Sequence, residues 1–499
     1  MTESVRQVVW FRRDLRVHDH PALAGALARG AVAPLFVLDP SLLRGRFASS
    51  NRVWFLLRAV DALAATLRER GATLHLGVGS PAEVVPAFAR DVGASDVWVS
   101  RDLAPYGRRR DLAVAEALGA AGVGFHARAG LVVHEPEVLD RAGGGTPAVF
   151  TPFLRRWERE AVRVVLPAPD RIPAVMTGSG AAAQAVDPLA GGVLAIPAVA
   201  RLRLEPPTAD PSRLPEPGEG AARTRLTHWL DSGLAAYDER RNELGDPSGT
   251  SRLGVDLRFG LLSPAEVVQQ VRMRGESRGA LRFLSQLAWR DFYAHLLWHR
   301  PEAARAAART RFAGARWPGG QLGDSAVAPG FDGPAEAWRQ GRTGYPIVDA
   351  GMRQLAATGW MHNRARMVVA SFLAKDLLID WRVGEAHFMR HLLDGDPASN
   401  LGGWQWAAST GVDAQPWFRV FNPVTQGRRF DADGGYVRRW VPELAMVPSA
   451  RVHAPWTMTG EEQAEARCRI GIDYPAPIVD HAAARERALA WFGSLRPDA

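Results

Sequence analysis

The chain has 499 residues, 47% of them hydrophobic and 23% charged, which is ordinary for a globular protein but too long for one core, so we expect two or three domains. A single cysteine, Cys468, excludes a disulfide framework and a cysteine-rich metal site, and we expect no metal centre. The sequence contains neither a signal-peptide pattern nor an uncharged apolar stretch long enough to span a membrane, so we expect a cytoplasmic protein without membrane attachment.

The basic charge of the chain is almost entirely arginine, because Lys375 is the only lysine. The formal net charge is +8 and the pI is about 10.3, values that suit a nucleic acid or another polyanion as partner. A GC-rich coding sequence would favour arginine, alanine, glycine and proline together and would give the same composition. Charge alone therefore leaves nucleic-acid binding open.

Residues 1–130 alternate short apolar runs with helical stretches such as residues 52–70. Strands alternating with helices are typical of a parallel sheet with helices on both faces. The sequence therefore predicts a doubly wound, parallel five-stranded α/β domain over residues 1–130. Its strands are expected at residues 8–11, 33–39, 73–78, 96–100 and 123–127.

The sequence Ser-Pro-Ala-Glu occurs twice, at residues 80–83 and 263–266. A serine followed three residues later by glutamate, with proline in the first turn, is typical of a helix start. We therefore predict that a helix begins at each copy.

Residues 167–222 are rich in proline, alanine and glycine without clear periodicity, which predicts an interdomain linker within residues 131–222. Beyond residue 222 the apolar spacing becomes helical, as in residues 368–378, and predicts an all-α domain over residues 223–499. This half holds 13 of the 17 tryptophans. Most of these should pack in the core, but the excess marks the helical half as the place for aromatic chemistry.

Residues 394–411, DGDPASNLGGWQWAASTG, bring together carboxylates, an amide, a glycine pair and two tryptophans. Two residues along a helix correspond to a rotation of about 200°, so Trp404 and Trp406 should face nearly opposite ways. The glycine pair would let a backbone or a flat ligand approach closely. Taken alone, the stretch is better explained as a capped helix carrying two core tryptophans.

Three further stretches combine polar and aromatic groups. Residues 360–367 place His362, Asn363, Arg364, Arg366 and Met367 at a helix start, where polar groups often meet anions. Residues 237–253 offer hydroxyl groups beside glycine and arginine, and residues 283–293 set Gln286 and Trp289 on one helical face. Each stretch alone is more often structural than functional.

Together these blocks resemble the photolyase and cryptochrome flavoproteins, and among them the class I cyclobutane pyrimidine dimer DNA photolyases. The resemblance extends from VVWFRRDLRVHDHPAL at residues 8–23 through GTSRL at residues 249–253 to WVPEL at residues 440–444, and is most specific between residues 343 and 431. It implies an antenna-binding α/β domain, a helical FAD-binding domain, and light-driven repair of UV-damaged DNA. In that reaction excited, reduced FAD donates an electron to the dimer, the cyclobutane bonds split, and the electron returns.

The resemblance also assigns residues to FAD. It places Asp394 and Asp396 against the adenosine and isoalloxazine parts, pairs Arg366 with Asp394, and sets Asn400 opposite flavin N5, where an amide is typical of photolyases and an acid of plant cryptochromes. The phosphates and ribityl chain would be held by Tyr237, Thr250, Ser251, Arg252 and Leu253.

A flipped-out lesion would stack against Trp289 and Trp406, in a pocket also lined by Asn363 and Met367. Where the family usually carries a glutamate, three residues before Trp289, this chain has Gln286. An amide can still bind a thymine edge but brings no charge to the dimer, so we expect binding to survive with some loss of repair yield. Basic positions along the lesion strand are matched by Arg241, Arg290, Arg364 and Arg419.

Photoreduction in the family commonly uses three tryptophans that lead to the surface. Trp404 and Trp381 match the first two, but the third falls near Ala328, where there is no tryptophan. Two alternatives follow from the missing third tryptophan. Electron transfer could reach the surface through Trp338 or Trp317, or photoreduction could be slow.

For the antenna chromophore, Gly107 stands where folate-binding members carry an acid. The resemblance therefore favours 8-hydroxy-5-deazaflavin, with Arg52 and Asp102 as contacts, over folate or a second flavin. An empty antenna site is the remaining alternative.

Two functions compete with dimer repair: a cryptochrome-like blue-light photoreceptor, and a repair-deficient DNA-binding flavoprotein. A (6-4) photolyase would be expected to carry histidine at the position of Asn363. Asn400 and the Trp-Gln-Trp sequence favour repair, and we expect a monomer.

Overall fold

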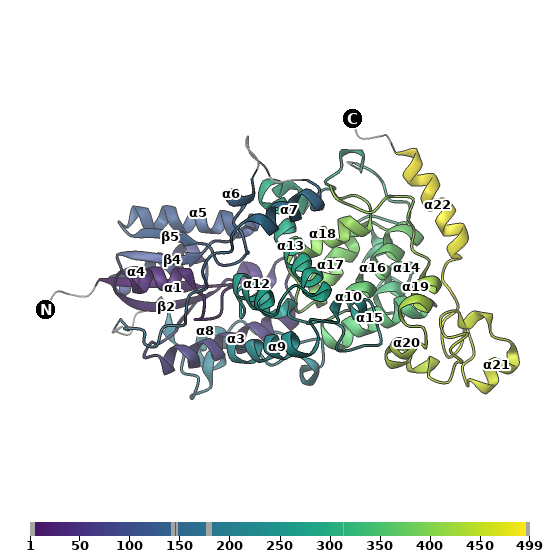
Figure 1. The fold of residues 1–499 in the computed structure, drawn as a ribbon, viewed down its shortest axis with the longest axis horizontal. Helices are drawn as coiled ribbons and strands as arrows, with labels where there is room; N and C mark the ends of the chain where they lie inside the picture. The colour runs from purple at the N-terminus through teal and green to yellow at the C-terminus, as the bar shows by residue number, and fades with distance from the viewer. Residues whose placement is uncertain (1–4, 141–144, 146–147, 176–181, 313, 496–499) are drawn as a thin grey trace. The chain divides into compact units, whose positions relative to one another are not determined.

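The structure, a computed structural model, describes residues 5–140, 145, 148–175, 182–312 and 314–495 (Figure 1). The chain divides into two compact units. The first unit consists of Met1–Pro207, Pro215–Asp238 and Ser251–Pro301, and the second of Thr208–Leu214, Glu239–Thr250 and Glu302–Ala499.

The first unit contains a parallel sheet with the strand order β5-β4-β1-β2-β3, and a short strand β6 pairs antiparallel with β3. In register, Val8 of β1 lies opposite Ala33 of β2 and Val97 of β4. The predicted doubly wound sheet and its parallel strands are confirmed, whereas β6 was not predicted, because two residues carry no periodicity. The strands are β1 (Arg6–Phe11), β2 (Ala31–Leu38), β3 (His75–Val78), β4 (Asp96–Ser100), β5 (Gly124–Arg128) and β6 (Gln184–Ala185).

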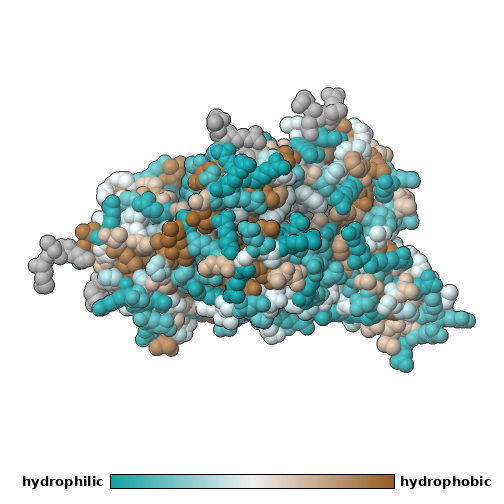
Figure 2. Space-filling model, viewed as in Figure 1, coloured by the Kyte–Doolittle hydropathy of each residue, from teal (hydrophilic) through white to brown (hydrophobic). Residues whose placement is uncertain are grey.

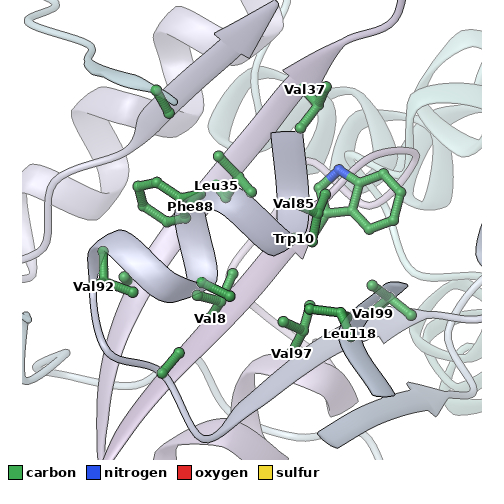
Figure 3. Packing of buried hydrophobic residues seen from close by; sticks show 14 of the residues in the cluster. Val8, Trp10, Leu35, Val37, Val85, Phe88, Val92, Val97, Val99 and Leu118 are labelled. Atoms are coloured by element: carbon green, nitrogen blue, oxygen red, sulfur yellow. The ribbon is translucent and has the colours of Figure 1, made fainter. Parts of the chain in front are cut away.

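Helices cover both faces of this sheet. On one face, Val8 and Trp10 pack with Phe88 of α4 (Pro81–Asp91) and Leu118 of α5 (Pro105–Ala120) in a buried hydrophobic cluster (Figure 3). On the other face, Trp98 packs so closely on α1 (Pro21–Leu27) that a Cβ at Gly25 would overlap its ring. Alternate strand residues therefore serve opposite cores, as the pleat requires.

Both Ser-Pro-Ala-Glu sequences begin a helix, as predicted. The Ser263 side chain accepts a hydrogen bond from the Glu266 N–H at the start of α12 (Pro264–Met273). The Ser80 side chain makes no such bond at the start of α4. The serine cap expected from this pattern therefore forms at α12 but not at α4, where Pro81 and the acidic Glu83 in the first turn support the helix start.

The stretch predicted as a linker, residues 131–222, carries several short elements besides irregular segments. It includes α6 (Pro136–Leu139), α7 (Phe150–Arg159), β6, η1 (Gly192–Ala195), α8 (Pro197–Ala200), η2 (Pro211–Arg213) and the start of α9 (Glu219–Ser232). The other helices that begin in the first unit are α2 (Pro40–Arg44), α3 (Ser50–Glu69), α10 (Tyr237–Arg240), α11 (Gly254–Phe259), α13 (Arg278–His299) and η3 (Pro301–Ala304).

The second unit is helical, as predicted, and no strand of a sheet occurs among its described residues. Its α-helices are α14 (Pro334–Arg339), α15 (Pro346–Thr358), α16 (Asn363–Ser371), α17 (Trp381–His391), α18 (Pro397–Ala407), α19 (Pro423–Phe430), α20 (Gly435–Trp440), α21 (Gly460–Glu465) and α22 (His481–Ser494). Shorter helical turns are η4 (Thr310–Phe312), η5 (Ser325–Val327), η7 (Pro442–Leu444) and η8 (Pro455–Thr457).

The apolar run at residues 368–378 is buried, but it is not one regular helix. After α16 the chain continues as a π-helix, η6 (Phe372–Asp376), and Leu378 then adopts a positive φ of 50°. Lys375 and Asp376 lie within this turn and are buried with their apolar neighbours. A π-turn places an extra residue in one helical turn, often at a functional site.

The surface seen in Figure 2 is hydrophilic over most of its area, with hydrophobic residues in smaller groups. Within the part of the chain that the structure describes, no helix is both long enough and apolar enough to cross a membrane.

Candidate functional site

The motif at residues 394–411 forms a loop followed by α18. The Asp396 carboxylate accepts hydrogen bonds from the backbone N–H groups of Ala398 and Ser399, both at 3.0 Å, and so caps the helix. The Asp394 carboxylate accepts from Arg366 Nη2 of α16 at 2.8 and 3.1 Å, so the predicted ion pair forms. The loop is thereby fixed at both acidic residues.

Asn400 lies in the first half of α18 and is 9% exposed. Its Nδ2 group donates to the backbone carbonyl of Glu385 at 3.1 Å and to Glu385 Oε1 at 3.4 Å. Glu385 belongs to α17, so α17 determines how the Asn400 amide is oriented. Sequence reasoning missed Glu385, because its role depends on the packing of two helices.

Trp404 and Trp406 face different environments, as the helical spacing predicted. Trp404 is 2% exposed and packs on α17, where a Cβ at Gly384 would overlap the indole. Trp406, two residues further, is only half-buried. One helix thus presents one indole to the core and the other outward.

The Trp404 ring has two aromatic neighbours in the second unit. Its centroid lies 5.0 Å from Phe388 and 6.1 Å from Trp338, both edge to face. Trp338 is 0% exposed and its Nε1 group donates to the carbonyl of Val369 at 3.0 Å. Trp381 is also buried, one helical turn before Gly384.

Trp317, the other predicted exit, belongs to a different aromatic group. Its ring centroid lies 4.7 Å from Trp491 and 6.2 Å from Phe492. Near Ala328, where the usual third tryptophan is missing, the chain forms the short turn η5.

Of the glycine pair in α18, Gly403 is exposed, and a Cβ placed there would meet nothing within 4 Å. No packing within the described chain therefore requires glycine at this position. The predicted close approach of a ligand at this point stays a prediction.

The start of α16 is built around His362, whose Nδ1 accepts from the Arg364 N–H at 3.0 Å and caps the helix. On the next turn, Asn363 Nδ2 lies 3.8 Å from the Met367 sulfur. Asn363 is exposed and Met367 is half-buried, so the two predicted pocket residues share one accessible face of α16.

Arg364 is the centre of a basic group in the second unit. It donates to Asn242 Oδ1 at 2.8 Å and lies 4.3 Å from the Phe430 ring. Burial, and next the positive charges of Arg241, Arg429 and Arg419, together lower the pKa of Arg364 to about 10. The guanidinium still carries its charge at neutral pH, and the group favours an anion. Sequence reasoning missed Arg429, because it joins the others only in space.

The predicted lesion residues of the first unit lie on α13. The Trp289 ring stacks face to face on Phe150, with centroids 3.7 Å apart and planes at 10°. The Gln286 Nε2 group donates to the Arg282 carbonyl at 3.5 Å, one turn back along the helix. Arg290 donates to the backbone carbonyls of Leu131 at 2.7 Å and Leu257 at 3.4 Å.

The predicted phosphate and ribityl contacts lie in and after α10. Tyr237 packs edge to face on Trp229 and Phe283. The Thr250 Oγ1 atom is buried and has no hydrogen-bond partner among the described residues. Arg252 has a φ of 53°, which is uncommon outside glycine. The other two contacts are Ser251, whose Oγ accepts from Leu253 N at 3.4 Å, and Leu253, which is 1% exposed.

The predicted antenna residue Asp102 lies at the carboxyl end of β4. Its carboxylate accepts from Ala104 N at 3.1 Å and is flanked by Arg13 at 3.5 Å and Arg110 at 3.4 Å. Burial acts to raise the pKa of Asp102, but these arginines hold it below its ordinary value. A Cβ at Gly107 would overlap the Asp102 side chain, so an acid at position 107 does not fit this arrangement.

Arg52 lies on α3, is 8% exposed, and donates to the carbonyl of Phe47. In the described ranges, no group of three or more histidine, cysteine or acidic residues could hold a metal ion.

Comparisons with known proteins place these observations in a family. The family model described as "DNA photolyase" matches residues 7–173, and the model described as "FAD binding domain of DNA photolyase" matches residues 283–494. A deoxyribodipyrimidine photo-lyase of Streptomyces griseus is 41% identical over 96% of this chain and 97% of its own length. Another, from Halobacterium salinarum, is 39% identical over 99% of this chain and 100% of its own length. The chain belongs to the DNA photolyase family.

Solved structures of photolyases and a cryptochrome share the fold. A bacterial class III photolyase from Agrobacterium tumefaciens has a TM-score of 0.87 and 36% identity, covering 99% of this chain and 98% of that one. A Synechocystis cryptochrome has a TM-score of 0.84 and 30% identity, covering 98% of this chain and 100% of that one.

The predicted family is confirmed, and with it a light-driven DNA-repair lyase with FAD as its cofactor. The predicted class I stays a prediction.

Proposed function

We propose that this photolyase splits cyclobutane pyrimidine dimers in UV-damaged DNA, using light and reduced FAD. The observation that carries the proposal is the arrangement of side chains on α18: Trp404 is buried, Trp406 faces outward, and the Asn400 amide is held in place by Glu385. The chain also matches deoxyribodipyrimidine photo-lyases over nearly its whole length. FAD, when bound, supplies the light-excited electron, and the protein supplies binding and orientation.

The residues present fit this cofactor. The Thr250 hydroxyl is buried without a partner in the described chain, and a phosphate or hydroxyl of FAD would satisfy it. The Arg366–Asp394 pair would hold the Asp394 carboxylate in place to accept hydrogen bonds from the adenosine and ring N–H groups. The remaining contacts proposed for the cofactor are Tyr237, Ser251, Arg252, Leu253 and Asp396.

Asn400 is the residue proposed to face the flavin ring. Because its Nδ2 donates to Glu385, the amide cannot turn freely, and it places no negative charge beside a reduced, anionic flavin. An acid at this position would repel that charge, so the amide favours the repair-competent form.

The lesion would be flipped out of the duplex, at a cost that damaged, poorly paired bases reduce. The residues proposed to contact it are Trp406, Asn363, Met367, Trp289 and Gln286. Apolar and aromatic side chains suit the stacked faces of the dimer, while the amides suit its polar edges.

The lesion strand would be held by arginines. Arg241, Arg364 and Arg419 form with Arg429 the basic group described above, and Arg290 is the fourth predicted contact. Guanidinium groups bind phosphate oxygens through paired N–H donors, so binding should weaken with salt.

For the antenna we propose 8-hydroxy-5-deazaflavin, bound in the first unit near Asp102 and Arg52. In a sheet with this strand order, ligands bind outside the carboxyl ends of the strands where the order reverses, here between β1 and β4. The Trp10 Nε1 group of β1 is buried there without a hydrogen-bond partner in the described chain. Folate is disfavoured, because an acid would not fit at Gly107. A second flavin is the other alternative, since the solved structure of an archaeal photolyase from Sulfolobus tokodaii contains two FAD molecules.

Electrons for photoreduction would reach the flavin through Trp404, supplied by Trp381 or Trp338.

We further propose that the protein is a monomer and that it works on DNA in the cytoplasm.

The test is a repair assay with purified, reduced protein and an oligonucleotide that carries one dimer. Blue light should remove the dimer, and darkness should not. In the same assay, the Gln286→Glu variant should show a higher repair yield than the unchanged protein. Binding without light-dependent loss would instead support a photoreceptor or a repair-deficient flavoprotein.

A Trp406→Leu variant tests the outward indole. Losing one aromatic–base stack should weaken dimer affinity roughly 5- to 150-fold. Trp440→Leu is the matched control, because Trp440 is also half-buried and is given no role in repair. Equal losses in both variants would show that only folding had suffered.

A further inference from the structure

Trp289, the lesion-stacking residue proposed for the first unit, has one face of its indole already covered. Phe150, the first residue of α7, lies against it with centroids 3.7 Å apart and planes at 10°. Phe150 is 8% exposed, whereas Trp289 is half-buried. What Trp289 exposes must therefore be its other face or its edge.

This stack is not a geometry that two aromatic rings adopt by preference. Isolated pairs favour offset or edge-to-face arrangements, because the negative faces of two rings repel each other. A close, nearly parallel stack needs surrounding contacts to hold it. The helices α7 and α13, which lie side by side in Figure 1, supply them.

Buried hydrogen bonds join these two helices. Trp157 of α7 donates its Nε1–H to Asp291 Oδ2 of α13 at 3.0 Å. The same oxygen accepts from Val133 N at 2.9 Å and His134 N at 3.3 Å. Asp291 and Trp157 are both 0% exposed, so α7 has little freedom to move along α13.

Aromatic contacts complete the arrangement. Phe292 meets the edge of Phe150 at 5.8 Å and the edge of Trp289 at 5.5 Å, and Tyr293 lies 5.3 Å from Trp289. One turn into α7, Phe153 packs on Phe292 and His295, both at 5.3 Å. The Trp289 indole is thus fixed at one face and along its edges before any DNA arrives.

We propose that Phe150 is a positioning residue for dimer recognition: it backs the Trp289 indole, so that a flipped base stacks only on the opposite face. The inference rests on the proposed function, because it takes Trp289 to contact the lesion. Its physical basis is preorganisation, since an indole already held at the required angle loses little freedom when the base arrives.

The experiment compares affinity for a dimer-containing oligonucleotide with affinity for the same undamaged sequence. Phe150→Leu keeps an apolar side chain but removes the ring, and should lower dimer affinity about three- to tenfold. Affinity for undamaged DNA should stay unchanged, and Phe150→Tyr, which restores a ring, should recover the dimer affinity.

Phe153→Leu is the matched control, because Phe153 lies in the same helix and is 0% exposed, yet packs on Phe292 and His295. It should lower the unfolding temperature without changing the ratio of the two affinities. An unchanged ratio in Phe150→Leu, or an equal change in Phe153→Leu, would overturn the inference.

Trp289→Leu separates this inference from the proposed function. If it leaves dimer affinity unchanged, the role proposed for Trp289 fails, and the role of Phe150 fails with it. If Trp289→Leu loses dimer affinity while Phe150→Leu does not, only the inference about Phe150 fails.

Discussion

Trp338 contacts Trp404 ring to ring, and Trp381 lies on α17 one turn before Gly384, on which the same indole packs. Electron transfer between aromatic rings slows steeply with separation, so both residues are placed to refill Trp404. Trp338 is 0% exposed and therefore cannot deliver electrons from solvent directly. Its contact with Trp404 still makes it the nearer candidate to replace the missing third tryptophan.

We expect Trp338→Phe to slow photoreduction of the bound flavin severalfold, because the variant keeps the packing but loses an easily oxidised ring. Transient absorption after a blue flash measures the rate directly. Trp317→Phe is the control, since Trp317 packs with Trp491 and Phe492 instead, and should leave the rate unchanged. An unaltered rate in Trp338→Phe would remove Trp338 from the route.

Single residues were predictable where their role follows from spacing along one helix. The separate environments of Trp404 and Trp406 follow from their rotation, and the Asn363–Met367 contact from a separation of four residues. Glu385, Arg429 and Phe150 were missed, because each acts on a residue distant in sequence. No local pattern indicates that Phe150 lies on Trp289.

At the scale of elements, the π-helix η6 buries the only lysine of the chain. Lys375 is 0% exposed, and its ammonium group donates to the carbonyl of Arg419 at 2.9 Å and to that of Trp417 at 3.5 Å. It thereby holds the loop that carries Arg419. Burial lowers the pKa of Lys375 from 10.5 to about 7, with Asp376 acting to raise it and Arg419 to lower it.

This shift predicts a pH-dependent stability. Between pH 7 and 10.5 the unfolded chain keeps the lysine proton and the folded protein has released it, so stability rises with pH by up to about 1.4 kcal/mol per unit. Lys375→Met should lack this rise when unfolding in denaturant is compared at pH 7 and pH 9.

NMR of protein labelled at lysine reports the same group directly, because the chain supplies one lysine signal. A titration midpoint near 10.5 would contradict the prediction. Burial raises the pKa of Asp376, which lies next to Lys375, so the Lys375→Met variant is needed to subtract the contribution of Asp376.

Strands and helices with a clear sequence pattern could be predicted, whereas short or irregular elements could not. The strands of the parallel sheet follow from runs of buried apolar residues, and the SPAE sequences mark two helix starts. The π-turn escaped prediction, because its apolar pattern is that of an ordinary helix. The short elements within residues 131–222 escaped it too, because proline and glycine hide any periodicity there.

Across the whole molecule, the net charge of +8 includes a localised basic group around Arg364, which favours DNA binding over a purely compositional origin of the charge. Each phosphate contact releases counterions, so affinity falls with salt in proportion to the number of contacts. The slope of log affinity against log salt therefore counts the arginines engaged.

Arg429→Gln should weaken binding to damaged and undamaged DNA alike, and should reduce that slope by about 1. Arg109→Gln removes an exposed arginine of α5 and serves as the control, with no change expected. Equal effects of the two variants would mean that net charge, and not the group around Arg364, determines the salt dependence.

Burial of the only lysine also has a chemical consequence for the surface. All the other strongly basic side chains of the protein are guanidinium groups, which do not react with amine-directed reagents. An active ester would therefore find no lysine amine exposed at the surface, and such labelling should leave the arginines free to bind DNA.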